Sequence, residues 1–237
     1  MIDISSHQAY GALKKILNGM QVRNFKEFNQ FVQKNALSKA NNWKYDVDNY
    51  GFSRYEKRFF ENIIFNEQLF KDTIYFKILG DALEIFAAFF CQWFEHDIQF
   101  GIKAGTWKFT GDLDDLGCDA IGELGSNSSK CFIQVKYRSS PKAVPFNLEV
   151  FSKLFTQATI SYGLDYKDPR QRLMFFTNIP INNADRKNAQ SLPFIRLASQ
   201  CKVPVVLIGK NEIEQLTGDS KHSNIDFWKS LNDKFTS

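Results

Sequence analysis

The chain has 237 residues, of which 43% are hydrophobic and 24 are Phe. That is enough apolar material for one good core, or for one core with a smaller appended domain. The formal net charge of +4 permits a nucleic-acid partner without requiring one, because such binding depends on local patches. The first 75 residues carry 11 Lys and Arg against 8 Asp and Glu, so most of the positive excess lies there.

The cysteines and histidines give no metal-binding pattern. They are Cys91, Cys118, Cys131, Cys201, His7, His96 and His222. No two cysteines form a C-x-x-C pair, so we expect no zinc site, reduced core thiols and surface histidines. The N-terminus lacks a signal-peptide pattern, and the most apolar run contains Asp81 and Glu84 and is too short for a bilayer. We expect a soluble, cytoplasmic chain that is not secreted and does not enter a membrane.

The first 75 residues are expected to be mainly helical. Hydrophobic spacing predicts helices at 7–20, 24–37 and 53–70, with a loop at 41–51 between the last two. Ser53 is a candidate N-cap for the third helix, with Glu56 three residues later.

From residue 76 the pattern changes to alternating helices and strands. A helix is predicted at 78–94, strands at 97–107, 118–124 and 130–138, a helix at 147–163, a strand at 172–177, a helix at 183–200, a strand at 203–209, and helices at 211–218 and 225–235. A three-strand meander followed by crossovers predicts a central mixed sheet flanked by helices. We therefore expect an α/β domain at 76–237 and a helical N-terminal region at 1–75, which could serve recognition, dimerisation or interaction.

The strand at 130–138 carries a polar face. Cys131, Ile133, Val135 and Tyr137 alternate with Phe132, Gln134, Lys136 and Arg138. A solvated outer face of an antiparallel sheet is the simplest interpretation of the second set. The alternative is a groove under the crossover helices, because one short hairpin can bring Asp119 beside Gln134, and Glu84 lies off the apolar stripe of its helix.

Carboxylates, an amide oxygen and a lysine together are suited to phosphodiester hydrolysis. Asp119 would hold Mg²⁺, or Mn²⁺ in its place, with further oxygens from the Gln134 side chain and the Val135 backbone carbonyl. The metal would acidify a bound water and stabilise charge on the phosphate. Lys136 would orient or deprotonate that water, and Glu84 would assist.

These residues resemble the PD-(D/E)XK nuclease superfamily in the variant where Gln replaces the second acid. The chain is most similar to Mrr-like restriction endonuclease domains and to nuclease domains found with helicases. The matching features are Gly117 and Asp119, "QVK" at 134–136, Glu84 on the preceding helix, and "FFTN" with the segment after it. Over residues 76–218, the resemblance implies a restriction-endonuclease-like core and a metal-dependent DNA endonuclease of restriction, defence or DNA processing. It is compatible with a homodimer, a helicase or other processing partner, and a cytoplasmic, nucleoid or nuclear location.

Several side chains around this set are candidate phosphate contacts. They are Arg138, Lys142, Thr177, Asn178, Arg186 and Lys187. A cap or turn is the structural alternative for Thr177 and Asn178. Asp112, Asp114 and Asp115 are alternative metal ligands, although Asp119 is best placed within its strand. Because Gln replaces an acid, a catalytically inactive subunit that binds DNA or another protein remains the alternative function.

Overall fold

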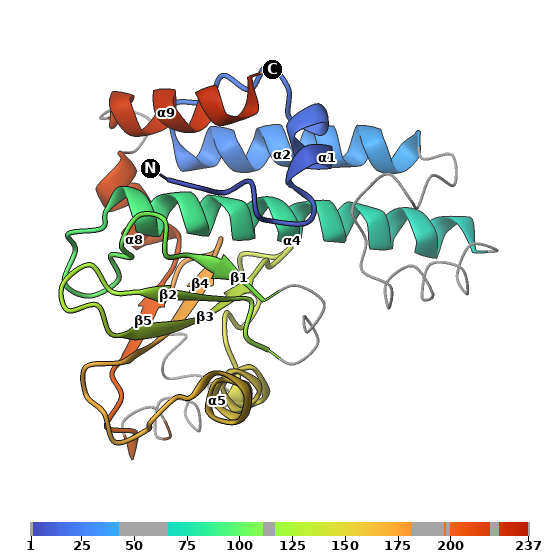
Figure 1. Ribbon diagram of the computed structural model, residues 1–237. Helices are drawn as coiled ribbons and strands as arrows, with labels where there is room; N and C mark the ends of the chain where they lie inside the picture. The colour runs from blue at the N-terminus through green and yellow to red at the C-terminus, as the bar shows by residue number, and fades with distance from the viewer. Residues whose placement is uncertain are drawn as a thin grey trace. The chain divides into compact units, whose positions relative to one another are not determined.

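The computed structural model describes residues 2–42, 66–110, 117–181, 197, 200–218 and 223–236. The helices are α1 (Tyr10–Ile16), α2 (Phe25–Asn41), α4 (Glu67–Trp93), α5 (Leu148–Tyr162), α8 (Lys210–Thr217) and α9 (Ile225–Phe235). The strands are β1 (Lys108–Phe109), β2 (Ala120–Glu123), β3 (Lys130–Lys136), β4 (Arg172–Thr177) and β5 (Val205–Ile208), as Figure 1 shows. Within these residues, no helix is long and apolar enough to cross a membrane.

The five strands form one mixed sheet in the order β1-β2-β3-β4-β5. The pairs β1–β2 and β2–β3 are antiparallel, while β3–β4 and β4–β5 are parallel. A parallel neighbour requires a crossover, and α5 supplies it between β3 and β4. The prediction of an α/β fold with a mixed sheet is therefore confirmed.

The chain divides into two compact units, which we describe separately. The sheet unit comprises Met1–Asp3 and Phe86–Glu212, and the helical unit comprises Ile4–Ile85 and Ile213–Ser237. The sequence-based division after residue 75 differs from this one in two ways. The observed boundary between the units lies within α4, between Ile85 and Phe86, and α4 is one continuous helix where two were expected. In addition, the last 25 residues belong to the same unit as the N-terminal helices.

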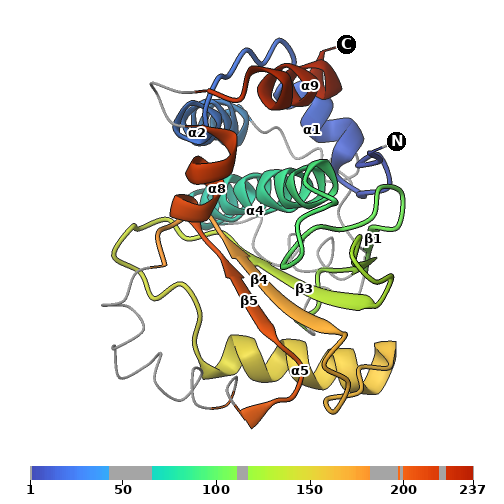
Figure 2. The same cartoon turned by 90° about the vertical axis from the view of Figure 1, so that its left-hand side faces the viewer.

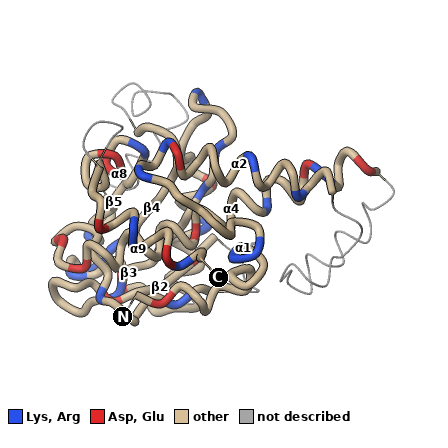
Figure 3. Tube along the Cα trace, turned by 90° about the horizontal axis from the view of Figure 1, so that it is seen from above, with Lys and Arg blue, Asp and Glu red and all other residues tan. Residues whose placement is uncertain are grey.

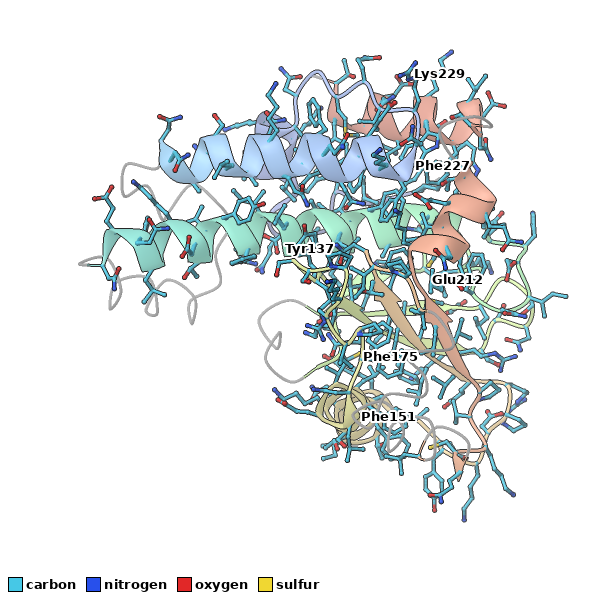
Figure 4. All side chains as sticks on the ribbon, turned by 180° about the vertical axis from the view of Figure 1, so that it is seen from behind. Tyr137, Phe151, Phe175, Glu212, Phe227 and Lys229 are labelled. Carbon is cyan, nitrogen blue, oxygen red and sulfur yellow. The ribbon has the colours of Figure 1, made fainter. Side chains whose placement is uncertain are left out.

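In the sheet unit, both faces of the sheet are covered. On one face, the Phe176 ring of β4 lies with its centroid 6.2 Å from that of Phe86 and 5.7 Å from that of Phe90, both in the last turns of α4. The other face is covered by α5 (Figure 2). There Phe175 stacks on Phe151 of α5 with ring centroids 6.0 Å apart (Figure 4 labels both residues). β4 is a continuous apolar run that is buried on both faces, and this places the sheet between two helix layers.

Two strand predictions in this unit need correction. Residues 97–107 form turns and one isolated bridge, because the Asp97 carboxylate accepts hydrogen bonds from the backbone N–H groups of Gln99 and Phe100 at 2.8 and 3.2 Å. The strand at 203–209, expected to be buried on both faces, is half-buried at Val205 and Leu207, since β5 is the last strand in the described sheet.

In the helical unit, α9 packs against the N-terminal segment. The Tyr10 hydroxyl donates to the Lys234 carbonyl at 2.8 Å. Asn232 forms two hydrogen bonds with the backbone of Val22, accepting at 3.1 Å and donating at 2.9 Å. These hydrogen bonds join residues more than 200 positions apart in sequence. They explain why the C-terminal segment belongs to the helical unit. The predicted loop at 41–51 and helix at 53–70 lie almost entirely outside the described residues.

Candidate active site in the sheet unit

The β2–β3 hairpin brings Asp119 and Gln134 together. Asp119 lies immediately before β2, and its backbone N–H donates to the Ile133 carbonyl at 2.8 Å. Its carboxylate oxygen Oδ2 accepts two hydrogen bonds of 2.5 Å, one from Nε2 of Gln134 and one from the backbone N–H of Val135. The expected proximity of Asp119 and Gln134 is therefore present, at hydrogen-bond distance.

Gln134 is completely buried, and Asp119 is only 6% exposed. Phe132, on the same strand face as Gln134 by alternation, belongs to a hydrophobic cluster with Phe151 and Leu154 of α5. The alternative in which Gln134 lies on a solvated outer face is therefore wrong, because α5 covers this face of β3.

The carbonyl oxygen of Gln134 is the unusual group of this site. Oε1 is buried and has no hydrogen-bond partner among the described residues. Exchanging the amide nitrogen and oxygen would not relieve this, because an oxygen would then face the Asp119 carboxylate. A buried acceptor without a partner costs about 1–3 kcal/mol, so a group that fills this position would be favoured.

Lys136 follows on the same face of β3 and is half-buried at the end of the strand. Its charge reaches the first turn of α5. The pKa of Glu149 there is lowered first by its hydrogen bond with Lys153 and, more weakly, by the charge of Lys136. Glu149 and Lys153 form an exposed ion pair of 2.9 Å, and this pair lies within the electrostatic range of Lys136.

Gly117 fixes the approach of the hairpin to α5. Its φ of +93° is a left-handed conformation that favours glycine. A Cβ atom at this position would lie 2.4 Å from Cβ of Lys153 and 3.0 Å from the backbone nitrogen of Leu154. The glycine two residues before Asp119 thus lets the chain pass directly beside the helix.

The predicted phosphate contacts at the end of β3 and β4 have backbone partners in the structure. Thr177 is buried and donates to the Lys136 carbonyl at 2.8 Å. Asn178 accepts from the Arg138 backbone N–H at 2.7 Å and donates to its carbonyl at 2.9 Å. These side chains hold the end of β3 to the end of β4, which is a structural role different from the cap or turn that was the alternative for Thr177 and Asn178.

Arg138 forms hydrogen bonds with the loop that leads into α5. Its guanidinium Nε lies 3.2 Å from the carbonyls of both Val144 and Pro145, and burial lowers its pKa. Lys142 is exposed on the same loop. The remaining candidates, Arg186, Lys187, Asp112, Asp114 and Asp115, lie outside the described residues.

Glu84 belongs to a second polar cluster, in the helical unit. His7, Asp81 and Glu84 each offer a ligand atom within 4.8 Å of the others, so this group could hold a metal ion. Nε2 of His7 lies 3.2 Å from Glu84, and Lys77 forms an ion pair of 2.7 Å with Asp81. His7 is 5% exposed, so the expectation that it is a surface residue is wrong.

Two contacts compete with a metal in this second cluster. Nδ1 of His7 accepts a hydrogen bond from the Ala9 backbone N–H at 3.1 Å, so the proton of a neutral ring lies on Nε2, facing Glu84. Metal binding through Nε2 would move that proton to Nδ1, against the Ala9 N–H. The ammonium of Lys77 already provides a cation for Asp81. Burial lowers the pKa of His7 most strongly, but the Glu84 hydrogen bond and the charges of Asp81 and Glu84 together outweigh it, so the pKa is raised overall.

Comparisons of the chain with protein-family models, with curated proteins and with solved structures found no match. The candidate site is therefore defined by its own residues: a carboxylate, a buried amide oxygen without a described partner and a lysine, within one hairpin.

Proposed function

We propose that this chain is a metal-dependent DNA endonuclease that hydrolyses phosphodiester bonds, with a restriction-endonuclease-like core in the sheet unit. The observation that carries the proposal is the buried Gln134 carbonyl oxygen, which belongs to the amide that donates to Asp119 and has no partner in the described structure. Oxygen donors of this kind match the preference of Mg²⁺ and Mn²⁺. The element order supports the proposal as well, because the antiparallel β1-β2-β3 meander, α5 and the parallel β4 follow the order of the motif residues.

The residues have distinct roles in this proposal. Asp119 and Oε1 of Gln134 would hold the cation, with the Val135 carbonyl as a further oxygen donor. When bound, a divalent cation would acidify a water ligand and offset negative charge on the phosphate. Lys136, two residues beyond Gln134, would orient the attacking water or stabilise the developing charge. Glu84, which was expected to assist, forms a hydrogen bond with His7 instead, so we assign no step to it.

A cleavage assay tests the proposal directly. Supercoiled plasmid, linear duplex and single-stranded DNA would be incubated with the purified chain in Mg²⁺, in Mn²⁺ and in EDTA. We expect cleavage only with metal, and a loss of about 100-fold or more in Asp119→Ala and Lys136→Ala. Glu123→Gln is the matched control, because Glu123 is an exposed carboxylate of the same hairpin. Metal-dependent cleavage that survives Asp119→Ala would show that the activity resides elsewhere.

A catalytically inactive DNA-binding or protein-interaction subunit is the second candidate. It is favoured by the hydrogen bonds that Asp119 accepts from Gln134 and Val135, which already stabilise the carboxylate without a metal. This candidate predicts no cleavage of any substrate and no effect of EDTA on DNA binding. A homodimer, or a complex with a helicase or other processing partner, is compatible with either function, and light scattering of the purified chain would test the dimer.

A further inference from the structure

The positive charge of the chain is concentrated in one segment of the helical unit. Residues 4–42 contain six basic residues and one acidic residue, a net charge of +5, whereas the whole chain has +4. The rest of the chain therefore has a net charge of −1. The basic residues are Lys14, Lys15, Arg23, Lys26, Lys34 and Lys39, and Figure 3 shows Lys and Arg in blue along α1 and α2.

The single acidic residue of this segment does not offset the lysines. Glu27 pairs with Arg23, with Nη2 of the arginine 2.9 Å from Oε1, and it also accepts the Arg23 backbone N–H at 2.9 Å. Glu27 thus neutralises Arg23 alone. The net positive charge of the segment therefore comes from the lysines of α1 and α2.

A shallow pocket of about 250 Å³ lies between the end of α1 and the last turns of α2. It is lined by Lys15, Ile16, Asn35, Ser38, Lys39 and Asn42. The lining thus contains two ammonium groups, two amides and a hydroxyl, and no carboxylate. Pockets that enclose drug-sized molecules measure about 300–1,000 Å³, so this smaller pocket suits a single phosphate group with part of its sugar.

Helical periodicity directs the α2 side chains of the pocket to one side. Asn35, Ser38, Lys39 and Asn42 follow the i, i+3, i+4, i+7 spacing of one helix face. Val32, Ala36 and Ala40 form the buried face of the same helix. Of the six lining side chains, Ile16 and Asn35 are half-buried and the other four are exposed.

The two amides are held in place by the helix and retain donor capacity. Nδ2 of Asn35 donates to the Phe31 carbonyl at 2.8 Å, and Nδ2 of Asn42 donates to the Ser38 carbonyl at 2.8 Å. Each amide NH₂ has two N–H groups, and these bonds use one of each. Within the part of the chain that the structure describes, the second N–H group of each amide is left to donate to a phosphate oxygen.

The C-terminal ends of α1 and α2 carry partial negative charge, which disfavours an anion in the pocket. The positive charge of the two lysines is larger. Each helix C-terminus contributes about −0.5 of an elementary charge, whereas Lys15 and Lys39 contribute +1 each. Counted over these described groups alone, the sum is about +1. Lys15 and Lys39 lie in the last turns of their helices, where a positive charge also stabilises the helix. Helix stabilisation alone would not require the two lysines to line the same pocket.

We propose that this pocket binds a phosphate group of a DNA backbone. The identity of the polyanion rests on the proposed nuclease function, whereas the anion preference rests on the pocket alone. Backbone contacts of this kind supply most nucleic-acid affinity and carry no sequence information. The helical unit would therefore hold duplex DNA without selecting its sequence.

The test is DNA binding of the full chain in EDTA, so that cleavage plays no part. Fluorescence anisotropy with a labelled duplex at several salt concentrations gives both the affinity and its salt dependence. In the double variant Lys15→Gln/Lys39→Gln, we expect the slope of log K against log[salt] to become shallower by about 0.9 for each phosphate that the variant no longer neutralises. We also expect the affinity to fall by about 8-fold or more near 0.1 M salt.

Lys229→Gln is the matched control, because Lys229 is an exposed lysine of α9 that does not line the pocket (Figure 4). Asp119→Asn distinguishes the two proposals, since it should abolish cleavage and leave binding in EDTA unchanged. An unchanged salt slope in the double variant, with unchanged thermal unfolding, would overturn the phosphate site. Binding of single-stranded RNA more than about ten-fold tighter than duplex DNA would overturn the DNA assignment.

Discussion

Replacing Gln134 with Glu restores the second acidic residue of the motif and places two carboxyl groups in contact. The amide nitrogen of Gln134 lies 2.5 Å from Oδ2 of Asp119, and the side chain is fully buried. If both carboxyls stayed ionised, two charges about 3 Å apart would repel by about 5.5 kcal/mol at an effective dielectric constant of 20. Binding a proton from solution at pH 7 is the less costly route.

The cost of that proton sets the size of the effect. A Glu side chain has an unfolded pKa of about 4.3, so its protonation at pH 7 costs about 2.7 pH units × 1.36 kcal/mol, or about 3.7 kcal/mol. The protonated carboxyl can donate to Asp119 in place of the amide. Because its folded pKa is raised above the unfolded value, the variant should match the parent below about pH 4.3 and lose stability as pH rises from there.

Urea unfolding at pH 5 and pH 7 in EDTA measures this cost. We expect Gln134→Glu to lose about 3–4 kcal/mol at pH 7 and about 1 kcal/mol at pH 5. Gln134→Met is the control, because it removes the hydrogen bond without adding charge and should cost about 1–3 kcal/mol at both pH values. If the cation site is correct, Mg²⁺ or Mn²⁺ at 100 times its dissociation constant should restore about 2.7 kcal/mol in Gln134→Glu and nothing in Gln134→Met.

Two results would refute this reasoning. Equal stability of Gln134→Glu and the parent at pH 7 in EDTA would mean that residue 134 is not buried against Asp119. A destabilised variant that no divalent cation restores would leave the packing intact and would remove the metal site from the proposal.

Two further predictions concern the same unit. Gly117→Ala should lower the free energy of unfolding by at least about 2 kcal/mol, because it combines a strained φ with a Cβ 2.4 Å from the Lys153 side chain. Gly19→Ala, with a positive φ but no atom within 4 Å of the new Cβ, should cost less in the same urea titration, and equal costs would contradict the close approach. Three of the four cysteines are buried, and burial raises the pKa of Cys118 to about 12, so a thiol reagent at pH 8 should modify one cysteine of the native chain and four in denaturant. The fast-reacting thiol should disappear in Cys201→Ser, and rapid modification of all four native thiols would contradict the packing.

Local patterns in the sequence were sufficient for the centre of the candidate site. Side-chain alternation placed Gln134 and Lys136 on one face of β3, and a short polar turn predicted the hairpin that brings Asp119 to Gln134. The end of α5 was also local information, because Gly163 adopts a φ of +76° at its C-cap. These features depend only on residues close together in the chain.

Other features of the site depend on contacts between residues that are distant in sequence. Alternation alone favoured a wet outer face for Gln134, and only the packing of α5 makes that side chain fully buried. The hydrogen bonds between Asn178 and Arg138 could not be predicted, because they join the ends of two strands 40 residues apart. For the same reason, no local pattern indicated that Glu84 would meet His7.

The sequence by itself determined which residue types follow one another on each strand and helix, and thus the α/β class and the Asp119–Gln134 pair. The tertiary structure alone decided which faces are covered, where the two units divide within α4, and that α9 belongs with the N-terminal helices. The physical reason is that periodicity specifies a face but not its partner. The partner depends on the packing of apolar surfaces from distant segments, and one amphipathic helix carries no information about which other surface will cover it.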